Sequence, residues 1–173
     1  MIIVTGASRG LGRAVAERLI SSGREVLSLS RTSEGAPGDS VACDVSDYEA
    51  VKAVAQSLRK EKREIEGLVN AAGIASMNLA VTTPPSMTQK LIQTNLAGTI
   101  HCCQLFAPLM IRKKAGSIIN FSTIAVTLGL KGESIYAASK AGVEGFSRAF
   151  AREMADFDIR VNCIAPGPIK TDL

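Results

Sequence analysis

Tryptophan is absent from this chain of 173 residues, and aromatic residues make up only 4% of it. Basic residues outnumber acidic residues by 20 to 16 and are scattered along the sequence. A nucleic-acid surface needs clustered cations with aromatic side chains between them. The composition therefore argues against nucleic-acid binding, although a mild positive charge is compatible with a small anionic ligand.

Motifs for metals, disulfide exchange and membranes are missing as well. The four cysteines, Cys43, Cys102, Cys103 and Cys163, include no Cys-x-x-Cys pair, so we expect neither a metal site nor a redox motif. The start of the chain does not resemble a signal peptide, and no apolar run approaches the about 18 residues that a membrane span requires. We expect a cytoplasmic protein that does not associate with membranes.

The sequence does contain short β-branched runs that alternate with longer segments of helical periodicity. This alternation predicts a doubly wound α/β fold of the Rossmann type, a parallel sheet with helices on both faces. No repeat or flexible linker divides the chain, so residues 1–173 are expected to form a single domain. We predict strands at 2–5, 25–30, 40–43, 67–70, 117–122 and 159–163, and helices at 10–22, 47–62, 85–113 with a break near Gly98, and 134–156.

Two connections can be described more closely. The segment "RTSEGAPGD" after the second strand is too short for a crossover helix, and its turn residues predict a loop. Ser46, three residues before Glu49, is the predicted N-cap of the helix at 47–62.

The first strand runs into a turn that holds Gly6, Gly10 and Gly12, and an amphipathic helix follows. Glycines in such a turn let the backbone approach a pyrophosphate, and the N-terminus of the helix directs free N–H groups at the phosphates. The order of strand, turn and helix favours dinucleotide binding. A tight turn without a ligand is the alternative.

Charge after the second strand indicates which dinucleotide binds. An acid at this point would hold the ribose hydroxyls of NAD, whereas a 2′-phosphate repels an acid and attracts arginine. Here Ser30 and Arg31 follow the strand, and Arg9 lies in the glycine turn. These residues predict NADP(H) as the cofactor, unless both arginines are simply solvated.

Six short motifs occur in a fixed order: "TGASRGLG", "CDV", "NAAG", "TNLAG", "YAASK" and "NCIAPGPIKTD". In this order they resemble the short-chain dehydrogenase/reductase family over essentially the whole chain. Within the family the chain is most similar to the 3-oxoacyl-[acyl-carrier-protein] reductase type. The resemblance implies the cofactor-binding residues Gly6, Ser8, Arg9, Gly10, Leu11, Gly12, Arg31, Asp44, Val45, Asn70, Ala71, Gly73, Tyr136, Lys140, Pro166, Gly167, Ile169 and Thr171.

Structural roles remain open for several of these positions. Asp44 is also an acid near the start of a helix, and Asn70 and Asn95 are also suited to binding backbone groups. The "APGP" stretch that contains Pro166 and Gly167 is also a plausible turn.

Tyr136 and Lys140 are four residues apart on a predicted helix, so both side chains can face the same ligand. A nearby ammonium is expected to lower the pKa of the tyrosine and to make it a proton donor at working pH. By resemblance, Tyr136 protonates the alkoxide, Lys140 tunes the phenol and holds the ribose, and Asn95 supports a water chain. By spacing alone, an exposed pair whose tyrosine merely packs remains the alternative.

The protein hydroxyl group that binds the substrate carbonyl is expected at Thr123, and Ser122 is the second candidate. Most members of the family carry serine at the position of Thr123. Threonine has the same hydroxyl donor and acceptor, but its extra methyl group restricts χ1. The orientation of this side chain is therefore the point to examine.

The resemblance implies an NADPH-dependent carbonyl reductase or alcohol dehydrogenase that acts on 3-oxoacyl thioesters, with acyl carrier protein as a candidate partner. Another alcohol, sugar or ketone as substrate and a non-catalytic NADP-binding sensor are the alternatives. Since the sequence ends just past the sixth strand, the family's substrate-covering segment and C-terminal strand are expected to be absent. The helices at 96–113 and 136–156 are expected to pair in a homo-oligomer, a dimer or a tetramer.

Overall fold

A single sheet of six parallel strands forms the centre of the computed structural model, which describes residues 1–169. The strands follow the order β3-β2-β1-β4-β5-β6, and every neighbouring pair is parallel. This confirms the predicted doubly wound α/β fold. The strands are β1 (Ile2–Thr5), β2 (Val26–Ser30), β3 (Asp39–Ala42), β4 (Gly67–Asn70), β5 (Gly116–Phe121) and β6 (Ile159–Ile164).

Helices connect successive strands except between β2 and β3, where residues 31–38 form a loop as predicted. The predicted helix at 85–113 is interrupted by a π-helical turn at Ile92–Ala97, which directly precedes Gly98. A 3-10 turn at Ala80–Thr82 was not predicted. The helices are α1 (Gly10–Ser21), α2 (Tyr48–Lys60), α3 (Pro85–Leu91), α4 (Gly98–Ile111), α5 (Ala125–Leu128) and α6 (Ser134–Ala155).

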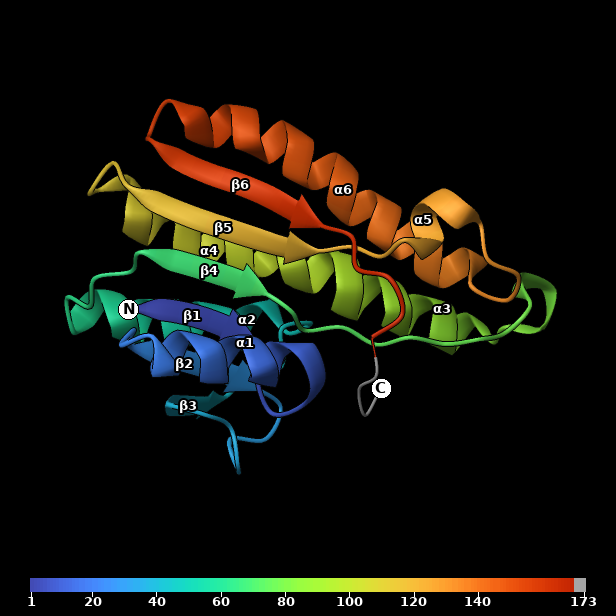
Figure 1. Cartoon of the computed structure of the whole chain (residues 1–173), viewed down its shortest axis with the longest axis horizontal. Coiled ribbons are helices and arrows are strands. Elements are labelled where there is room, and N and C mark those ends of the chain that lie inside the picture. The colour runs from blue at the N-terminus through green and yellow to red at the C-terminus, as the bar shows by residue number, and fades with distance from the viewer. Residues whose placement is uncertain (170–173) are drawn as a thin grey trace.

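The two faces of the sheet are covered unequally (Figure 1). Ile3, Leu68 and Ile118 point to the larger core, which contains buried side chains of α2, α4 and α6. Val4 and Val69 alternate to the other face, where Ala16 of α1 covers them. Successive side chains of a strand point to opposite faces, so these apolar runs are buried on both sides. No helix within residues 1–169 is long and apolar enough to span a membrane.

The start of α2 differs from the prediction. The N-cap is Asp47, whose carboxylate accepts hydrogen bonds from the N–H groups of Glu49 at 2.9 Å and Ala50 at 3.2 Å. Ser46 instead gives both its backbone N–H and its hydroxyl to the Asp44 carboxylate. The assignment of Ser46 as N-cap is therefore wrong, because the Ser46 hydroxyl is hydrogen-bonded to Asp44, two residues earlier.

The order of the strands creates the site. Because β1 lies between β2 and β4, the connections that leave β1 and β4 run to opposite sides of the sheet. A crevice opens at the carboxyl ends of the strands where the order reverses in this way. The glycine turn after β1 and the Ala71–Gly73 segment after β4 meet at this crevice.

Asp47→Ala should lower the free energy of unfolding by about 1 kcal/mol, because two N–H groups at the start of α2 lose their acceptor. Urea unfolding followed by circular dichroism measures the change. Asp47→Asn is the matched control, since its amide oxygen still caps the helix. Equal stability of the alanine variant and the parent chain would contradict the assignment of Asp47 as the cap.

Candidate functional site

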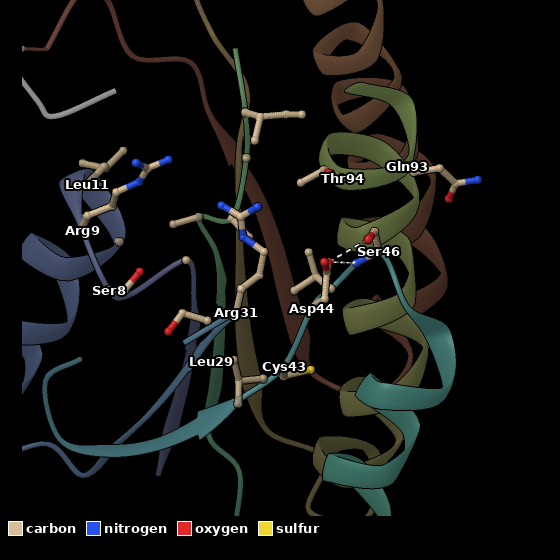
Figure 2. A pocket seen from close by; sticks show the side chains of 18 of the residues that line it. Ser8, Arg9, Leu11, Leu29, Arg31, Cys43, Asp44, Ser46, Gln93 and Thr94 are labelled. Carbon is tan, nitrogen blue, oxygen red and sulfur yellow. Dashed lines mark hydrogen bonds between the residues drawn. The ribbon is translucent and has the colours of Figure 1, made fainter. Parts of the chain in front are cut away.

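A cavity of about 340 Å³ lies at the carboxyl ends of β1, β2 and β4 (Figure 2). Its volume falls within the range of small-molecule pockets. Glycines, alanines and two arginines are among the residues that line it. It is lined by Gly6, Ser8, Arg9, Leu11, Gly12, Leu29, Ser30, Arg31, Cys43, Asp44, Val45, Ser46, Ala71, Ala72, Gly73, Ile74, Lys90, Gln93 and Thr94.

The glycine turn is shaped for close backbone approach. Gly6 has a φ of +68°, and a Cβ atom at Gly12 would lie 2.4 Å from the Gly6 carbonyl oxygen. The N-terminus of α1 receives no side-chain cap from Arg9, and its first turn contains no acid. Free N–H groups at a helix start bind anions, so the turn and the helix together fit the pyrophosphate of a dinucleotide.

The wall opposite this turn carries one carboxylate between two cations. The Asp44 carboxylate accepts hydrogen bonds at 2.9 Å from the N–H and at 2.7 Å from the hydroxyl of Ser46. Burial raises the pKa of Asp44, but these hydrogen bonds and the charges of Arg31 and Lys90 outweigh burial and lower it. In Figure 2, Arg31 extends from the end of β2 between Arg9 and Asp44.

Val45, which lies in the same wall, packs against α4. A Cβ atom at Gly98 would lie 2.7 Å from Val45 Cγ2, so only glycine admits the valine at this distance. One helical turn further, His101 Nδ1 lies 3.0 Å from the Val45 carbonyl oxygen and donates to it. The edge of the Tyr48 ring packs against the His101 ring, with 5.3 Å between centroids. These contacts fix the backbone of the segment that carries Asp44.

Lys140 lies at the other end of the crevice, at the carboxyl end of β5. Its side chain is buried, and Nζ donates to the Phe121 carbonyl oxygen at 2.8 Å. Burial lowers the pKa of Lys140 from 10.5 to about 8. A Cβ atom at Gly73 would lie 3.4 Å from Lys140 Nζ, so the cavity lining reaches the lysine.

Tyr136 lies one turn before Lys140 on α6. Burial raises the pKa of Tyr136, a hydrogen bond with Thr123 lowers it, and the charge of Glu133 raises it further. The prediction that a nearby ammonium lowers this pKa is therefore wrong for the structure described. Burial prevails because the Lys140 ammonium is directed to the Phe121 carbonyl.

The two adjacent hydroxyl residues after β5 have different partners. Ser122 is buried and donates to Glu144 Oε1 at 2.6 Å. The Thr123 hydroxyl oxygen accepts from the Ala125 N–H at 3.2 Å, and Thr123 lies close enough to Tyr136 to lower the pKa of its phenol. The structure thus brings Thr123, and not Ser122, together with Tyr136.

Asn95 lies in the π-helical turn and is fully buried. Its Oδ1 accepts from the Ile74 N–H at 2.8 Å, and its Nδ2 donates to the Ile74 carbonyl at 2.9 Å and to Ser139 Oγ at 3.0 Å. Both amide protons are therefore used within the protein. Asn95 thus joins the loop after β4 to α6, and its support of a water chain stays a prediction.

Several predicted cofactor residues lie outside the cavity lining. Asn70 is buried in the sheet, where its amide donates to Asn120 at 2.8 Å. Gly10 does not line the cavity, and Pro166, Gly167 and Ile169 follow β6, where the Pro166 carbonyl accepts from the Ile124 N–H at 3.0 Å. Thr171 lies outside the described residues. The lining residues that were not predicted to bind cofactor are Leu29, Ser30, Cys43, Ser46, Ala72, Ile74, Lys90, Gln93 and Thr94.

Some of these lining residues could have been predicted from the sequence. Ser30, Cys43 and Ser46 adjoin predicted contacts, so their positions at strand ends point to the same edge of the sheet. Lys90 lies in α3 and Thr94 lies in the π-helical turn that follows it, and the approach of both to the cavity depends on tertiary packing. Figure 2 shows the Gln93 side chain directed away from the other labelled residues.

The described residues hold no cluster of three metal-ligating side chains. Although Cys102 and Cys103 directly follow His101, both thiols are buried in the core. Burial is the main reason that the pKa values of both thiols are raised. They are protonated in the ordinary pH range, as expected of packing residues.

Comparison with known proteins gives a consistent result. The family model for short chain dehydrogenase matches residues 1–173. The 3-oxoacyl-[acyl-carrier-protein] reductase FabG of Salmonella typhimurium is 37% identical over 180 residues, which cover 99% of this chain and 74% of that protein. The human 3-oxoacyl-[acyl-carrier-protein] reductase is 40% identical over 179 residues, with coverage of 98% and 76%.

Solved structures are similar over the same span. The ligand-free aldohexose dehydrogenase of Thermoplasma acidophilum has a TM-score of 0.94 and 36% identity, and the match covers 99% of this chain and 68% of that one. The structure of ElxO with NADP bound has a TM-score of 0.92 and 30% identity, with coverage of 99% and 74%.

The pKa of Lys140 predicts a pH dependence of stability. Because the folded chain loses this proton near pH 8 and the unfolded chain loses it near 10.5, the unfolded chain binds more protons between these values. Stability should therefore rise with pH across this window, and the contribution should disappear as pH falls through about 8. Relative to Lys140→Met, we expect the parent chain to gain on the order of 1 to 3 kcal/mol over the window. Urea unfolding at several pH values measures the difference, and parallel pH profiles would contradict a buried, depressed Lys140.

Proposed function

The chain belongs to the short-chain dehydrogenase family, and we propose that it is an NADPH-dependent carbonyl reductase that acts on 3-oxoacyl thioesters. One observation carries the proposal. The Tyr136 phenol, with Thr123 beside it, lies one helical turn from the buried Lys140 ammonium, next to the lining of a glycine-rich cavity. A proton donor and a cation beside a dinucleotide cradle suit the reduction of a carbonyl group.

The charges at the mouth of the cavity support NADP(H) over NAD(H). Arg31 follows β2, where an acid would hold the ribose hydroxyls of NAD, and Arg9 is exposed in the glycine turn. The cavity does contain Asp44, but Ser46 and the nearby cations satisfy its carboxylate. The similarity to ElxO, whose structure has NADP bound, also supports this assignment.

When bound, the reduced nicotinamide would supply the hydride for the carbonyl carbon. Tyr136 would donate its phenolic proton to the carbonyl oxygen, so that an alcohol forms and no charge is left on the product. Because burial raises the pKa of Tyr136, the phenol holds its proton at neutral pH and is ready to donate it. Thr123 would hold the carbonyl oxygen beside the phenol, since it lies next to Tyr136.

Lys140 would supply positive charge beside the resulting phenolate and would hold the ribose of the cofactor. Its pKa of about 8 lets it carry a proton at neutral pH although it is buried. Asn95 would act by position, because it fixes Ile74 and thereby the turn at Gly73 that leaves space beside Lys140.

Apolar side chains around the catalytic end support an acyl substrate over a sugar. Met77 is 77% exposed, Val81 is 91% exposed and Leu128 is 59% exposed. The Asn78 N–H donates to the Gly132 carbonyl at 2.9 Å and joins the loop after β4 to the segment that precedes Tyr136. Exposed apolar side chains on these linked segments suit contact with an acyl chain. The names of the similar 3-oxoacyl-[acyl-carrier-protein] reductases support delivery of the acyl group on acyl carrier protein.

A homo-oligomer, dimer or tetramer, is part of the same proposal. Ala138, Ala141, Gly145 and Ala149 are exposed on α6 and would allow a second helix to approach closely. Gly142 has a different role, since a Cβ atom there would lie 2.8 Å from Leu96 of the same chain.

Tyr136→Phe should reduce turnover by about 100-fold to 10,000-fold, because the proton donor is lost. NADPH affinity should change little. Separate assays follow NADPH consumption with 3-oxoacyl thioesters and with simple ketones, and NADPH formation from NADP+ during the oxidation of an aldohexose. Tyr48→Phe is the matched control, because Tyr48 is the other tyrosine and lies on α2 outside the cavity.

The outcomes separate the candidate functions. Turnover of aldohexose but not of thioesters would reassign the substrate to sugars. NADPH binding without turnover in any assay would favour a non-catalytic sensor, and full activity of Tyr136→Phe would remove the tyrosine from the mechanism.

Arg31→Asp should weaken NADPH binding by about 10-fold or more and should leave NADH binding unchanged or stronger, because an acid repels the 2′-phosphate. Fluorescence titration with both cofactors measures the ratio. Arg13→Asp is the control, because Arg13 lies in α1 outside the cavity lining. An unchanged NADPH to NADH ratio would exclude Arg31 as the selecting residue.

A further inference from the structure

Three consecutive residues, at and just after the end of β5, are each held by a different side chain of α6. Asn120 Nδ2 donates to Ser147 Oγ at 2.8 Å, and the Phe121 carbonyl accepts from Lys140 at 2.8 Å. Ser122 donates to Glu144, and Thr123, the next residue, lies beside Tyr136. The α6 residues involved are Tyr136, Lys140, Glu144 and Ser147, which share one face of the helix because they are spaced by three or four residues.

The proposed reaction uses neither Glu144 nor Ser147, and Glu144 is the one of the two that carries an ionisable side chain. Its side chain is 25% exposed, and its second oxygen, Oε2, lies 3.8 Å from the largely exposed Arg148. Its first oxygen, Oε1, receives the Ser122 hydroxyl at 2.6 Å. That distance is typical of an O–H group that donates to an ionised carboxylate, which is among the stronger hydrogen bonds in proteins.

The pair sits directly before the hydroxyl that faces Tyr136. The Ser122 N–H donates to the Ile164 carbonyl of β6 at 2.8 Å, and its hydroxyl is drawn to Glu144. The backbone that leaves Ser122 is thereby fixed on both sides. Because the methyl group of threonine restricts χ1, the direction of the Thr123 hydroxyl follows from this backbone.

We infer that Glu144 is a positioning residue: by holding the Ser122 hydroxyl away from the substrate, it orients Thr123 toward Tyr136. The inference rests on the proposed reductase function and deepens it. It explains how a chain with two adjacent hydroxyl residues presents only one of them. Without the carboxylate, the Ser122 hydroxyl keeps only a 3.5 Å contact with the Lys140 carbonyl, so the backbone that carries Thr123 loses its anchor on α6.

Turnover provides the first test. Glu144→Ala should lower kcat about 10-fold, the cost of misaligning one hydrogen bond in the transition state, and NADPH affinity should stay within about 2-fold of the parent value. Glu144→Gln should restore kcat, because its amide oxygen still accepts from Ser122. Ser122→Ala should match Glu144→Ala, and the double variant should be no worse than either, because both remove the same contact. Arg148→Ala is the control and should retain full activity.

A second measurement does not depend on turnover. In a Tyr48→Phe background Tyr136 is the sole tyrosine, and the resonance of its labelled ring carbon next to the hydroxyl reports hydrogen bonding at the phenol. This resonance should move in Glu144→Ala and Ser122→Ala and should stay in place in Glu144→Gln. Circular dichroism verifies that each variant is folded, and failure of one alanine variant to fold leaves the other to decide.

The two measurements distinguish the possible failures. An unmoved Tyr136 resonance in both alanine variants, or an equal loss of kcat in Glu144→Gln and Glu144→Ala, would overturn the positioning role. Absence of turnover in the parent chain with every carbonyl substrate would overturn the proposed function, and the resonance would still decide the role of Glu144.

Discussion

The burial of the Lys140 ammonium is the constraint on which the catalytic end of the crevice depends. Its only hydrogen-bond partner among the described residues is the Phe121 carbonyl, and burial lowers its pKa to about 8. A buried cation with one neutral partner destabilises the fold, because its hydration is not fully replaced. Its position is therefore better explained by function than by stability. The neighbouring contacts of α6 with β5 supply the rigidity that keeps the lysine in place.

Close backbone approach builds the rest of the site. Gly12 lies against the Gly6 carbonyl, Gly98 lies against Val45, and Gly73 lies against Asn95 and Lys140. At each of these places a side chain would fill the space that a ligand or a neighbouring segment requires. The absence of side chains at these glycines thus shapes the cavity, while a few polar groups in its lining define its chemistry.

The strands were predictable to within about one residue, because a buried parallel strand is a short apolar run between turn residues. The N-cap of α2 was not predictable, since Ser46 and Asp47 are both good N-cap residues. Only the contact of Ser46 with Asp44 decides between them. The direction of the Tyr136 pKa shift was also out of reach. The sequence shows that a lysine lies four residues away, but it does not show that the Lys140 ammonium donates its hydrogen bond to the Phe121 carbonyl. Lys90 was missed for a similar reason, because no local pattern relates α3 to the end of β3.

The π-helical turn at Ile92–Ala97 illustrates how the fold joins its two halves. Such turns widen a helix by one residue and are frequent at functional sites. Here the turn directs the Asn95 side-chain amide inward, where it hydrogen-bonds with Ile74 and Ser139. The Thr99 hydroxyl donates to the Asn95 backbone carbonyl at 2.8 Å. Asn95 therefore connects the loop after β4, which lines the cofactor cavity, with the helix that carries Tyr136 and Lys140. Because both sides meet at one buried amide, a shift of the cavity wall and a shift of the catalytic helix cannot occur independently.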